Sequence, residues 1–473
     1  MSFKEYAGYD AIGLAALIQR REVSAAEVLE AALERADRHN PHLNAIVHRA
    51  DDEARARARS PIAGPFQGVP FLVKDLYADI AGWPQSNGSK FFKGYVSKTD
   101  SELVRRFRQS GLVLFGKTNT PEFGITGTTE GAALGPCRNP WNTRHSAGGS
   151  SGGAAAAVAA GIVPMAHASD GLGSIRIPAA CCGLVGLKVT RDRTPRDPMT
   201  PQTGLAVNHV VTRTMRDTAA MLDAIGFAGA GDPYAYPAKE RPYIEEVLRQ
   251  PRRLRIAFSG KTVSDTPLHP DVERALAATA KLCEDLGHFV IERPLRLDWR
   301  LLYRAQGAHS AGHFGAGMLQ AISEMGREPA EGELEPLTLS IWQASKTLSA
   351  DKAAWGTMML AHLTRELLEQ WEHFDVFLSP TMINPPPEIG FIDPVNLDPK
   401  TVNKRQAATY GFTPPSNMTG QPSLSLPLHM SAEGLPIGMM FTARYADEAT
   451  LIRLGAQLEQ ARPWSGRKPA HWN

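Results

Sequence analysis

The pattern of apolar and polar positions along the chain predicts helices with clear start and stop signals. The segment Val23–Val28 combines a serine–glutamate capping box with two flanking valines, so we expect a helix from Ala25 to Asn40, before Pro41. A second helix is expected from Pro270 to Leu286, where Gly287 follows the last turn. Its apolar stripe consists of Val272, Leu276, Ala280, Cys283 and Leu286.

Short apolar runs between such helical segments predict strands. Leu112–Phe115 and Leu254–Phe258 are two of them. Helices that alternate with strands favour an α/β fold, in which a mixed β-sheet carries helices on both faces. With 473 residues, of which 43% are hydrophobic and 21% charged, the chain has enough apolar material for a large core.

The charge balance argues against a polyanionic partner. The 51 Lys and Arg residues nearly cancel the 49 Asp and Glu residues, which leaves a formal net charge of +2. No strong field therefore favours nucleic acid or a membrane surface, and we expect neither as a partner. The N-terminal residues form no apolar signal core, and the apolar stretch 154–166 is too short to span a membrane. A cytoplasmic location is the resulting expectation.

The cysteines indicate neither a metal site nor disulfides. Their spacing matches no zinc pattern, and we expect four buried, reduced thiols: Cys137, Cys181, Cys182 and Cys283. We expect no metal and no cofactor.

The most informative stretch, Ala147 to Thr190, places two serines in glycine-rich backbone without a nearby histidine base built around them. Ser150 lies among four glycines, and Ser174 follows Asp170-Gly171-Leu172-Gly173. Glycines in such a turn can adopt positive φ and direct successive backbone N–H groups toward one point. Acyl transfer requires this geometry, because negative charge develops on the carbonyl oxygen of the substrate.

Two other interpretations of the Ser150 segment fit less well. The run 148–152 matches the G-x-S-x-G elbow of α/β-hydrolases, but the residues before it, 142–147, are too polar for the apolar strand that an elbow requires. A phosphate-binding loop is also disfavoured, since no Gly-Lys-Ser/Thr follows.

Several motifs together resemble the amidase signature family. They are the two serine segments, Gly68–Asp75, Gly116–Glu122, Arg138–Asn142 and Asn417–Pro427. The resemblance implies the fold of that family over a single domain, 1–473, with residues 228–380 as a variable helical region that shapes the substrate pocket. No linker or shift in composition divides the chain. Within the family, three segments look most similar to bacterial hydrolases of nylon-type cyclic oligoamides: Phe66–Leu76, His167–Asp170 and Pro380–Gly390.

The resemblance also implies roles for individual residues. Ser174 would be the nucleophile, and the backbone amides of Gly171, Leu172, Gly173 and Ser174 would form the oxyanion hole. Ser150 would relay a proton to Lys74, which acts as a base only while neutral; burial among apolar neighbours favours that state. Family members hold the relay serine with a cis peptide bond, here Gly149-Ser150.

Three further polar residues are expected to support the site. Ser151 can cap the alanine-rich helix that follows it, while Asp170 and Arg176 can hydrogen-bond the loop backbone. His145 and His167 flank the segment without a carboxylate partner in sequence, and we interpret them as pocket or structural histidines.

The chain departs from the family pattern at two positions. Leu172 stands where glycine is common, and Val189 replaces the proline of a usual Lys-Pro-Thr. The backbone donor at Leu172 survives if its φ is negative, and its side chain would then crowd or line the acyl pocket.

The leading functional hypothesis is hydrolysis of carboxamide C–N bonds through a serine acyl-enzyme. Alternatives are a carbamate (urethane) or ester hydrolase with the same triad, an ammonia-delivering subunit of a tRNA-dependent amidotransferase, and a binding protein without activity. The expected partner is a small-molecule amide or carbamate, with a homodimer left open. Large side chains that could line an apolar pocket, though more typical of core, are Trp299, Tyr303, Phe314, Met318, Trp342 and Trp355.

Overall fold

A computed structural model of the chain describes residues 3–195, 204–228, 238–262 and 265–472. Its centre is an 11-stranded sheet in the order β1-β3-β2-β8-β10-β9-β14-β15-β13-β11-β12. The sheet is mixed: β2 runs parallel to β3 and β8, whereas β10, β14 and β15 pair antiparallel to their neighbours. The strands are β1 Ile46–Arg49, β2 Pro70–Lys74, β3 Val113–Thr118, β8 Met165–Asp170, β9 Val185–Lys188, β10 Val207–Thr212, β11 Arg255–Phe258, β12 Phe289–Glu292, β13 Val376–Pro380, β14 Ser423–Met430 and β15 Pro436–Ala443.

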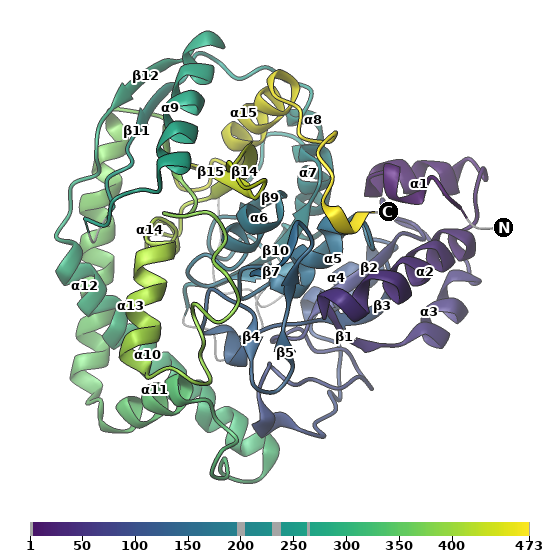
Figure 1. Cartoon of the computed structure of the whole chain (residues 1–473), viewed down its shortest axis with the longest axis horizontal. Helices are drawn as coiled ribbons and strands as arrows, with labels where there is room; N and C mark the ends of the chain where they lie inside the picture. Colours follow the sequence, from purple (N-terminus) through teal and green to yellow (C-terminus); the bar gives the residue numbers. More distant parts are fainter. Residues whose placement is uncertain (1–2, 196–203, 229–237, 263–264, 473) are drawn as a thin grey trace.

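Helices cover both faces of the sheet, as the sequence predicts (Figure 1). On one face, α5 (Gly152–Ala159) and α6 (Arg176–Cys182) pack against each other. On the other, α7 (Met215–Ile225) packs against α15 (Glu448–Ala461). The catalytic candidates lie at the ends of β2 and β8 and at the starts of α5 and α6, in the middle of this layered body.

The predicted elements are confirmed, with one correction. Helix α9 covers Pro270–Asp285, and the two predicted strands are β3 and β11. Helix α2 carries the predicted capping box but extends over Ala25–Leu43, so it continues past Pro41. Pro41 lies in the last turn, where the side chain of Asn40 accepts the N–H groups of Ala45 and Ile46 and completes the helix end. The expected stop before Pro41 was therefore wrong by one turn.

A layer of helices covers one side of this body (Figure 1). It consists of α10 (Trp299–Met325), α11 (Pro336–Thr347) and α12 (Ala350–Glu369), followed by α13 (Pro399–Tyr410) and α14 (Pro414–Thr419). Residues 228–380 also supply β11, β12 and β13, so this segment contributes to the sheet as well as to the helical layer. The other α-helices and strands are α1 Ala11–Gln19, α3 Asp51–Ala58, α4 Glu102–Gln109, α8 Tyr243–Glu246, β4 Glu130–Gly131, β5 Gly135–Pro136, β6 Arg138–Asn139 and β7 Asn142–Ser146.

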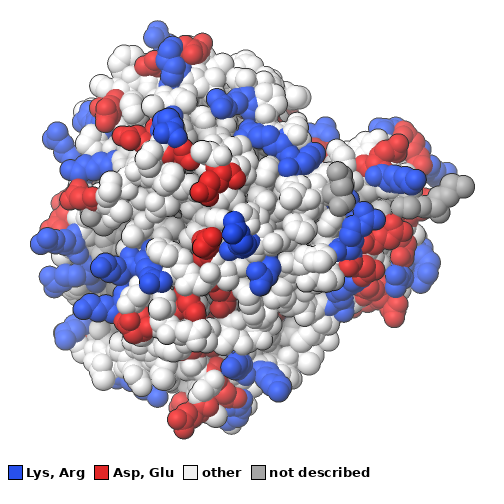
Figure 2. Space-filling model, viewed as in Figure 1, with Lys and Arg blue, Asp and Glu red and all other residues white. Residues whose placement is uncertain are grey.

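The distribution of charged side chains on the surface agrees with the near-neutral net charge of the chain. Figure 2 shows basic and acidic side chains interspersed over the visible face. Among the described residues, no helix is long and apolar enough to cross a membrane, and no cluster of three or more His, Cys, Asp or Glu side chains could hold a metal ion. The four cysteines are buried and free, as expected.

Candidate active site

Lys74 ends β2, a strand that is buried along its whole length. Its ammonium nitrogen lies 2.7 Å from Ser150 Oγ and 3.0 Å from Ser169 Oγ. The strand thus delivers one long polar side chain into the interior, where two hydroxyl groups meet it.

Burial changes the protonation of this lysine. Removal from water lowers the pKa of Lys74 to about 7, even though the negative charge of Asp170 acts in the opposite direction. The adjacent carboxylate of Asp75 pairs instead with Lys117, at 3.3 Å, and within the described residues Lys74 has no ion pair. A large fraction of Lys74 is therefore neutral near pH 7 and able to accept a proton.

Ser150 lies in the turn between β7 and α5. The Gly149-Ser150 peptide bond is cis, which confirms the expectation drawn from the family resemblance. Only glycine fits at position 149, because a Cβ there would lie 2.5 Å from the carbonyl oxygen of Thr128. This tight packing fixes the backbone next to the relay candidate.

Ser174 occupies the turn between β8 and α6 and is partly exposed, unlike Ser150 and Lys74. Leu172 has no positive φ, so its backbone keeps a conformation open to any residue. Among the described residues, the amides of Gly171, Leu172 and Ser174 have no hydrogen-bond partner. These three N–H groups remain available to an oxyanion.

The amide of Gly173, also a predicted oxyanion donor, differs from these three because it has a partner within the protein. It donates to Asp170 Oδ1 at 2.7 Å and is therefore already paired. Position 173 nevertheless requires glycine, because its φ is +139° and a Cβ would lie 2.4 Å from Thr413 Oγ1. Gly173 shapes the loop, while the free donors come from its neighbours.

The fully buried ion pair between Arg176 and Asp170 supports the loop that contains Gly173. Arg176 donates to both carboxylate oxygens of Asp170, at 2.9 and 3.0 Å, and Asp170 also accepts the amide of Ile175 at 3.1 Å. Burial alone would raise the pKa of Asp170, but the charge and hydrogen bonds of Arg176 hold it well below its usual range. Asn417 of α14 completes the network by donating to Asp170 at 2.9 Å.

Ser151 supports the site differently from the expectation. It precedes α5 but makes no side-chain cap, which corrects the predicted role. Its hydroxyl donates to the carbonyl of Ser169 at 3.2 Å and accepts the amide of Ser169 at 3.3 Å. Ser151 thereby ties the start of α5 to the strand that carries Ser169.

The two histidines have structural contacts. His167 Nδ1 accepts the backbone N–H of Lys74 at 3.2 Å, so Nε2 carries the proton and donates to Asn208 Oδ1 at 3.3 Å. Burial lowers the pKa of His167 to about 3, which keeps the ring neutral. His145 lies against the carbonyl of Pro386 at 2.9 Å. Neither ring is bonded to Ser150 or Ser174.

Two polar residues of the site, Ser169 and Asn417, received no role from the sequence, although both lie in segments that carry the family resemblance. Ser169 contacts Lys74, and two signals could have indicated it: Ser169 lies in the segment His167–Asp170, and it shares one face of β8 with His167. Asn417 lies 247 residues beyond Asp170, and no local pattern connects the two.

Comparison with known proteins identifies the family. The model of the family described as Amidase matches residues 27–452. The chain is 39% identical to the "Putative amidase AmiC" of Mycobacterium leprae over 96% of both chains. It is 35% identical to the 6-aminohexanoate-cyclic-dimer hydrolase of Paenarthrobacter ureafaciens, covering 97% of this chain and 96% of that protein. The chain belongs to the amidase signature family. The solved structure of a 6-aminohexanoate cyclic dimer hydrolase superimposes with a TM-score of 0.92 at 34% identity, over 99% of each chain.

Membership in the amidase signature family confirms the predicted fold, enzyme class and nylon-oligomer hydrolase likeness. The protein is a hydrolase of amide bonds.

The large side chains of the helical layer divide into two apolar clusters. Phe314, Met318 and Trp342 of the helical layer are buried in one cluster with Phe123, which lies outside that layer. Trp299, Tyr303 and Trp355 pack on a second cluster, and the side chain of Leu172 packs on that same cluster. The first three residues therefore pack between the helical layer and the segment around Phe123, and the other three pack between that layer and the loop that contains Leu172.

Proposed function

We propose that this amidase cleaves carboxamides through an acyl-enzyme, with Ser174 as nucleophile, Ser150 as proton relay and Lys74 as base. The observation that carries the proposal is the buried 2.7 Å contact between Lys74 and Ser150, on a lysine whose pKa is lowered to about 7. A serine hydroxyl is a poor nucleophile until a base accepts its proton. A neutral buried amine next to a second serine supplies that base without a histidine.

In the first step the Ser174 oxygen bonds to the carbonyl carbon of the amide. The Ser174 proton passes to Ser150, whose own proton passes to Lys74. The carbonyl oxygen becomes an oxyanion, which the free amides of Gly171, Leu172 and Ser174 would bind. Each preorganised donor of this kind contributes about 3 to 4 kcal/mol to the transition state.

In the second step the C–N bond breaks, and the proton held by Lys74 returns through Ser150 to the leaving amine. Water then enters and loses a proton by the same route as it attacks the acyl-enzyme. Collapse of this second intermediate releases the carboxylic acid and restores Ser174 with its proton. No net proton is gained or lost by the enzyme over the cycle.

We propose secondary carboxamides as the substrate class, because a similar relative is named for hydrolysis of the 6-aminohexanoate cyclic dimer and another is named an amidase. The carbamate, ester and ammonia-delivery alternatives are less favoured, since neither of those names refers to them. Within the class, the aliphatic cyclic dimer is the first compound to test.

The test compares turnover of the cyclic dimer, an aryl acylamide, a carbamate and an ester by the purified protein. We expect amide turnover that Ser174→Ala abolishes. Ser60→Ala is the matched control, because Ser60 is exposed and its hydroxyl bonds only to the carbonyl of Ala56. Turnover of carbamates or esters without amides would overturn the assigned substrate class.

A partition experiment tests the acyl-enzyme itself. Two amides with the same acyl group and different amines should give the same ratio of hydroxamate to acid when hydroxylamine competes with water. A ratio that depends on the leaving amine would exclude a common acyl-enzyme.

A further inference from the structure

A cavity lies at the carboxyl ends of three parallel strands. It has a volume of about 460 Å³, and its lining includes Ser259 after β11, Pro294 after β12 and Ser379 in β13. The strands β12 and β13 both run parallel to β11. Open α/β sheets bind ligands at this end of their strands, and the volume falls in the range of small-molecule sites. Neither Lys74 nor Ser174 lines the cavity.

The walls of this cavity are apolar. They are built by Leu295, Leu297, Leu367, Trp371 and Phe377. The polar side chains beneath them are already paired: Gln421 bonds the carbonyl of Ala443 at 2.7 Å, and Thr442 lies 3.0 Å from Ser423 Oγ. Among the described residues the indole N–H of Trp371 is buried without a partner, and apart from this one donor the interior favours an apolar ligand body.

The lining also includes two cations. Lys261 is 68% exposed, and its nearest carboxylate, Asp265, lies 4.0 Å away. Arg296 is exposed, and its guanidinium has no ion pair within the described ranges. Two cations against one carboxylate leave a net positive charge beside an apolar interior, which suits a single anionic head group.

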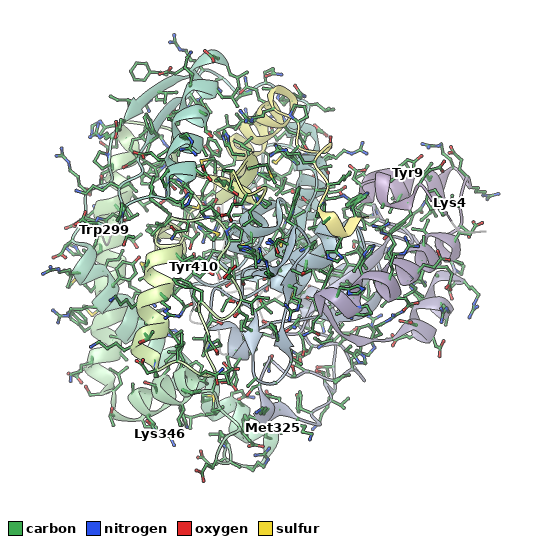
Figure 3. The ribbon with its side chains drawn as sticks, viewed as in Figure 1. Lys4, Tyr9, Trp299, Met325, Lys346 and Tyr410 are labelled. Atoms are coloured by element: carbon green, nitrogen blue, oxygen red, sulfur yellow. The ribbon has the colours of Figure 1, made fainter. Side chains whose placement is uncertain are left out.

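We propose that this cavity binds a monocarboxylic acid, with its apolar chain or ring against the wall that contains Trp371 and Phe377 and its carboxylate at Lys261 and Arg296. Such acids are products of the hydrolysis proposed above. The binding site is inferred from the cavity alone and does not depend on that hydrolysis. Figure 3 labels Trp299, which also lines the cavity, at the outer side of the molecule. Tyr410, which does not line the cavity, is labelled near the middle.

The cavity shares a wall with the support of the oxyanion loop. Ser416 lines the cavity and accepts a hydrogen bond from Arg176 at 2.6 Å, and Arg176 in turn holds Asp170. The lining residues Leu297 and Trp299 pack on the same apolar cluster as Leu172. An occupant therefore contacts groups that position the loop, and its binding is expected to change kcat of amide turnover.

The test measures binding of 4-phenylbutyrate by titration calorimetry, with 4-phenylbutanol as the neutral counterpart. We expect one site for the acid, weaker binding of the alcohol, and about tenfold weaker acid binding in the double variant Lys261→Met/Arg296→Met, the scale of two exposed charge contacts. Arg300→Met is the matched control, because Arg300 is exposed and does not line the cavity. Acid binding that the double variant leaves unchanged would overturn the proposal, as would no binding.

Two further readouts separate this site from the catalytic one. Ser174→Ala should bind the acid as the unaltered protein does, whether or not the protein proves to be a serine amidase. In amide turnover, the acid should lower kcat in the unaltered protein and in Arg300→Met, and this effect should weaken in the double variant. Purely competitive inhibition would place the acid in the catalytic site instead.

Discussion

At the scale of single residues, the central feature is a lysine kept in the interior at a cost to stability. Lys74 is completely buried and has two hydroxyl partners, yet the charged form that it would have in water is disfavoured there. The same burial that lowers the pKa of Lys74, and so suits it to the proposed role of base, therefore makes it a poor residue for stability. Both consequences can be measured.

The activity consequence is a pH profile. Because Lys74 accepts a proton only when neutral and its pKa is about 7, kcat/KM for an uncharged amide should rise with pH through about 7 and then level off. His167 does not contribute to this rise, since burial lowers its pKa to about 3. A profile that is flat or falling between pH 6 and 8 would contradict the assignment of Lys74.

The stability consequence appears in Lys74→Met, which should be inactive and more stable at low pH. The pKa of Lys74 is lowered in the folded state from 10.5 to about 7, so between these values only the unfolded chain binds the proton, and stability rises with pH. The gain in Tm of Lys74→Met over the unaltered protein should therefore be larger at pH 6 than at pH 10. Lys93→Met, at an exposed position, should show no such trend.

Leu172 is the second residue with a measurable role. Its side chain packs on the cluster formed by Leu302, Leu360 and Met418, which predicts that it supports the loop rather than selecting the substrate. Leu172→Ala should cost about 1 to 2 kcal/mol of stability, less than a fully buried leucine would, and should lower kcat/KM for small and bulky acyl groups alike. A change of more than tenfold in the ratio between such substrates would show instead that Leu172 lines the acyl pocket.

At the scale of elements, two buried carboxylates, Glu122 and Glu335, lie where the helical layer meets the rest of the protein. Glu335 precedes α11, and its backbone N–H donates to Glu122 Oε2 at 2.8 Å. The Glu335 carboxylate accepts the amide of Ala132 at 2.7 Å. Burial, and then the nearby charge of Glu122, raise the pKa of Glu335 to about 7.

This junction predicts that Glu335→Gln stabilises the protein above neutral pH. Between pH 4.5 and about 7 the folded protein keeps a proton that the unfolded chain has lost, so the contribution of Glu335 to stability falls as the pH rises through this window. Glutamine carries no charge and can still accept the amide of Ala132. The variant should gain about 2 kcal/mol in unfolding free energy at pH 8 and much less at pH 5.

Denaturant unfolding at the two pH values checks this result. Glu331→Gln, at an exposed position just before the junction, is the control and should change little at either pH. An equal effect of Glu335→Gln at pH 5 and pH 8 would exclude a charge penalty at this junction.

The elements also show what sequence reasoning can and cannot reach. Helix α9 and the start of α2 were predictable because caps and apolar stripes act within a few residues. The end of α2 was not predictable, because Pro41 suggests that the helix stops before it. The side chain of Asn40 instead accepts the N–H groups of Ala45 and Ile46 and completes the helix end beyond Pro41. Ser169 and Asn417 lie in segments that carry the family resemblance, but their contacts with Lys74 and Asp170 depend on strand pairing and on packing of α14, which no local pattern encodes.

At the scale of the whole molecule, one large sheet brings distant segments of the chain to a common point. Lys74 comes from β2, Ser150 from the turn before α5, and Ser174 from the turn before α6 (Figure 1). The family resemblance, rather than a local pattern alone, proposed these three positions as catalytic. The state of each backbone donor depends on the folded loop, as the paired amide of Gly173 demonstrates.

The most direct test of the account is to identify the serine that forms the covalent bond. The active protein would be treated with a fluorophosphonate, digested, and mapped by peptide mass spectrometry, with Ser174→Ala and Ser60→Ala treated in parallel. We predict one label on Ser174, loss of activity in proportion to labelling, and no label in Ser174→Ala. A label on Ser150 that accompanies inactivation would contradict the account and make Ser150 the nucleophile.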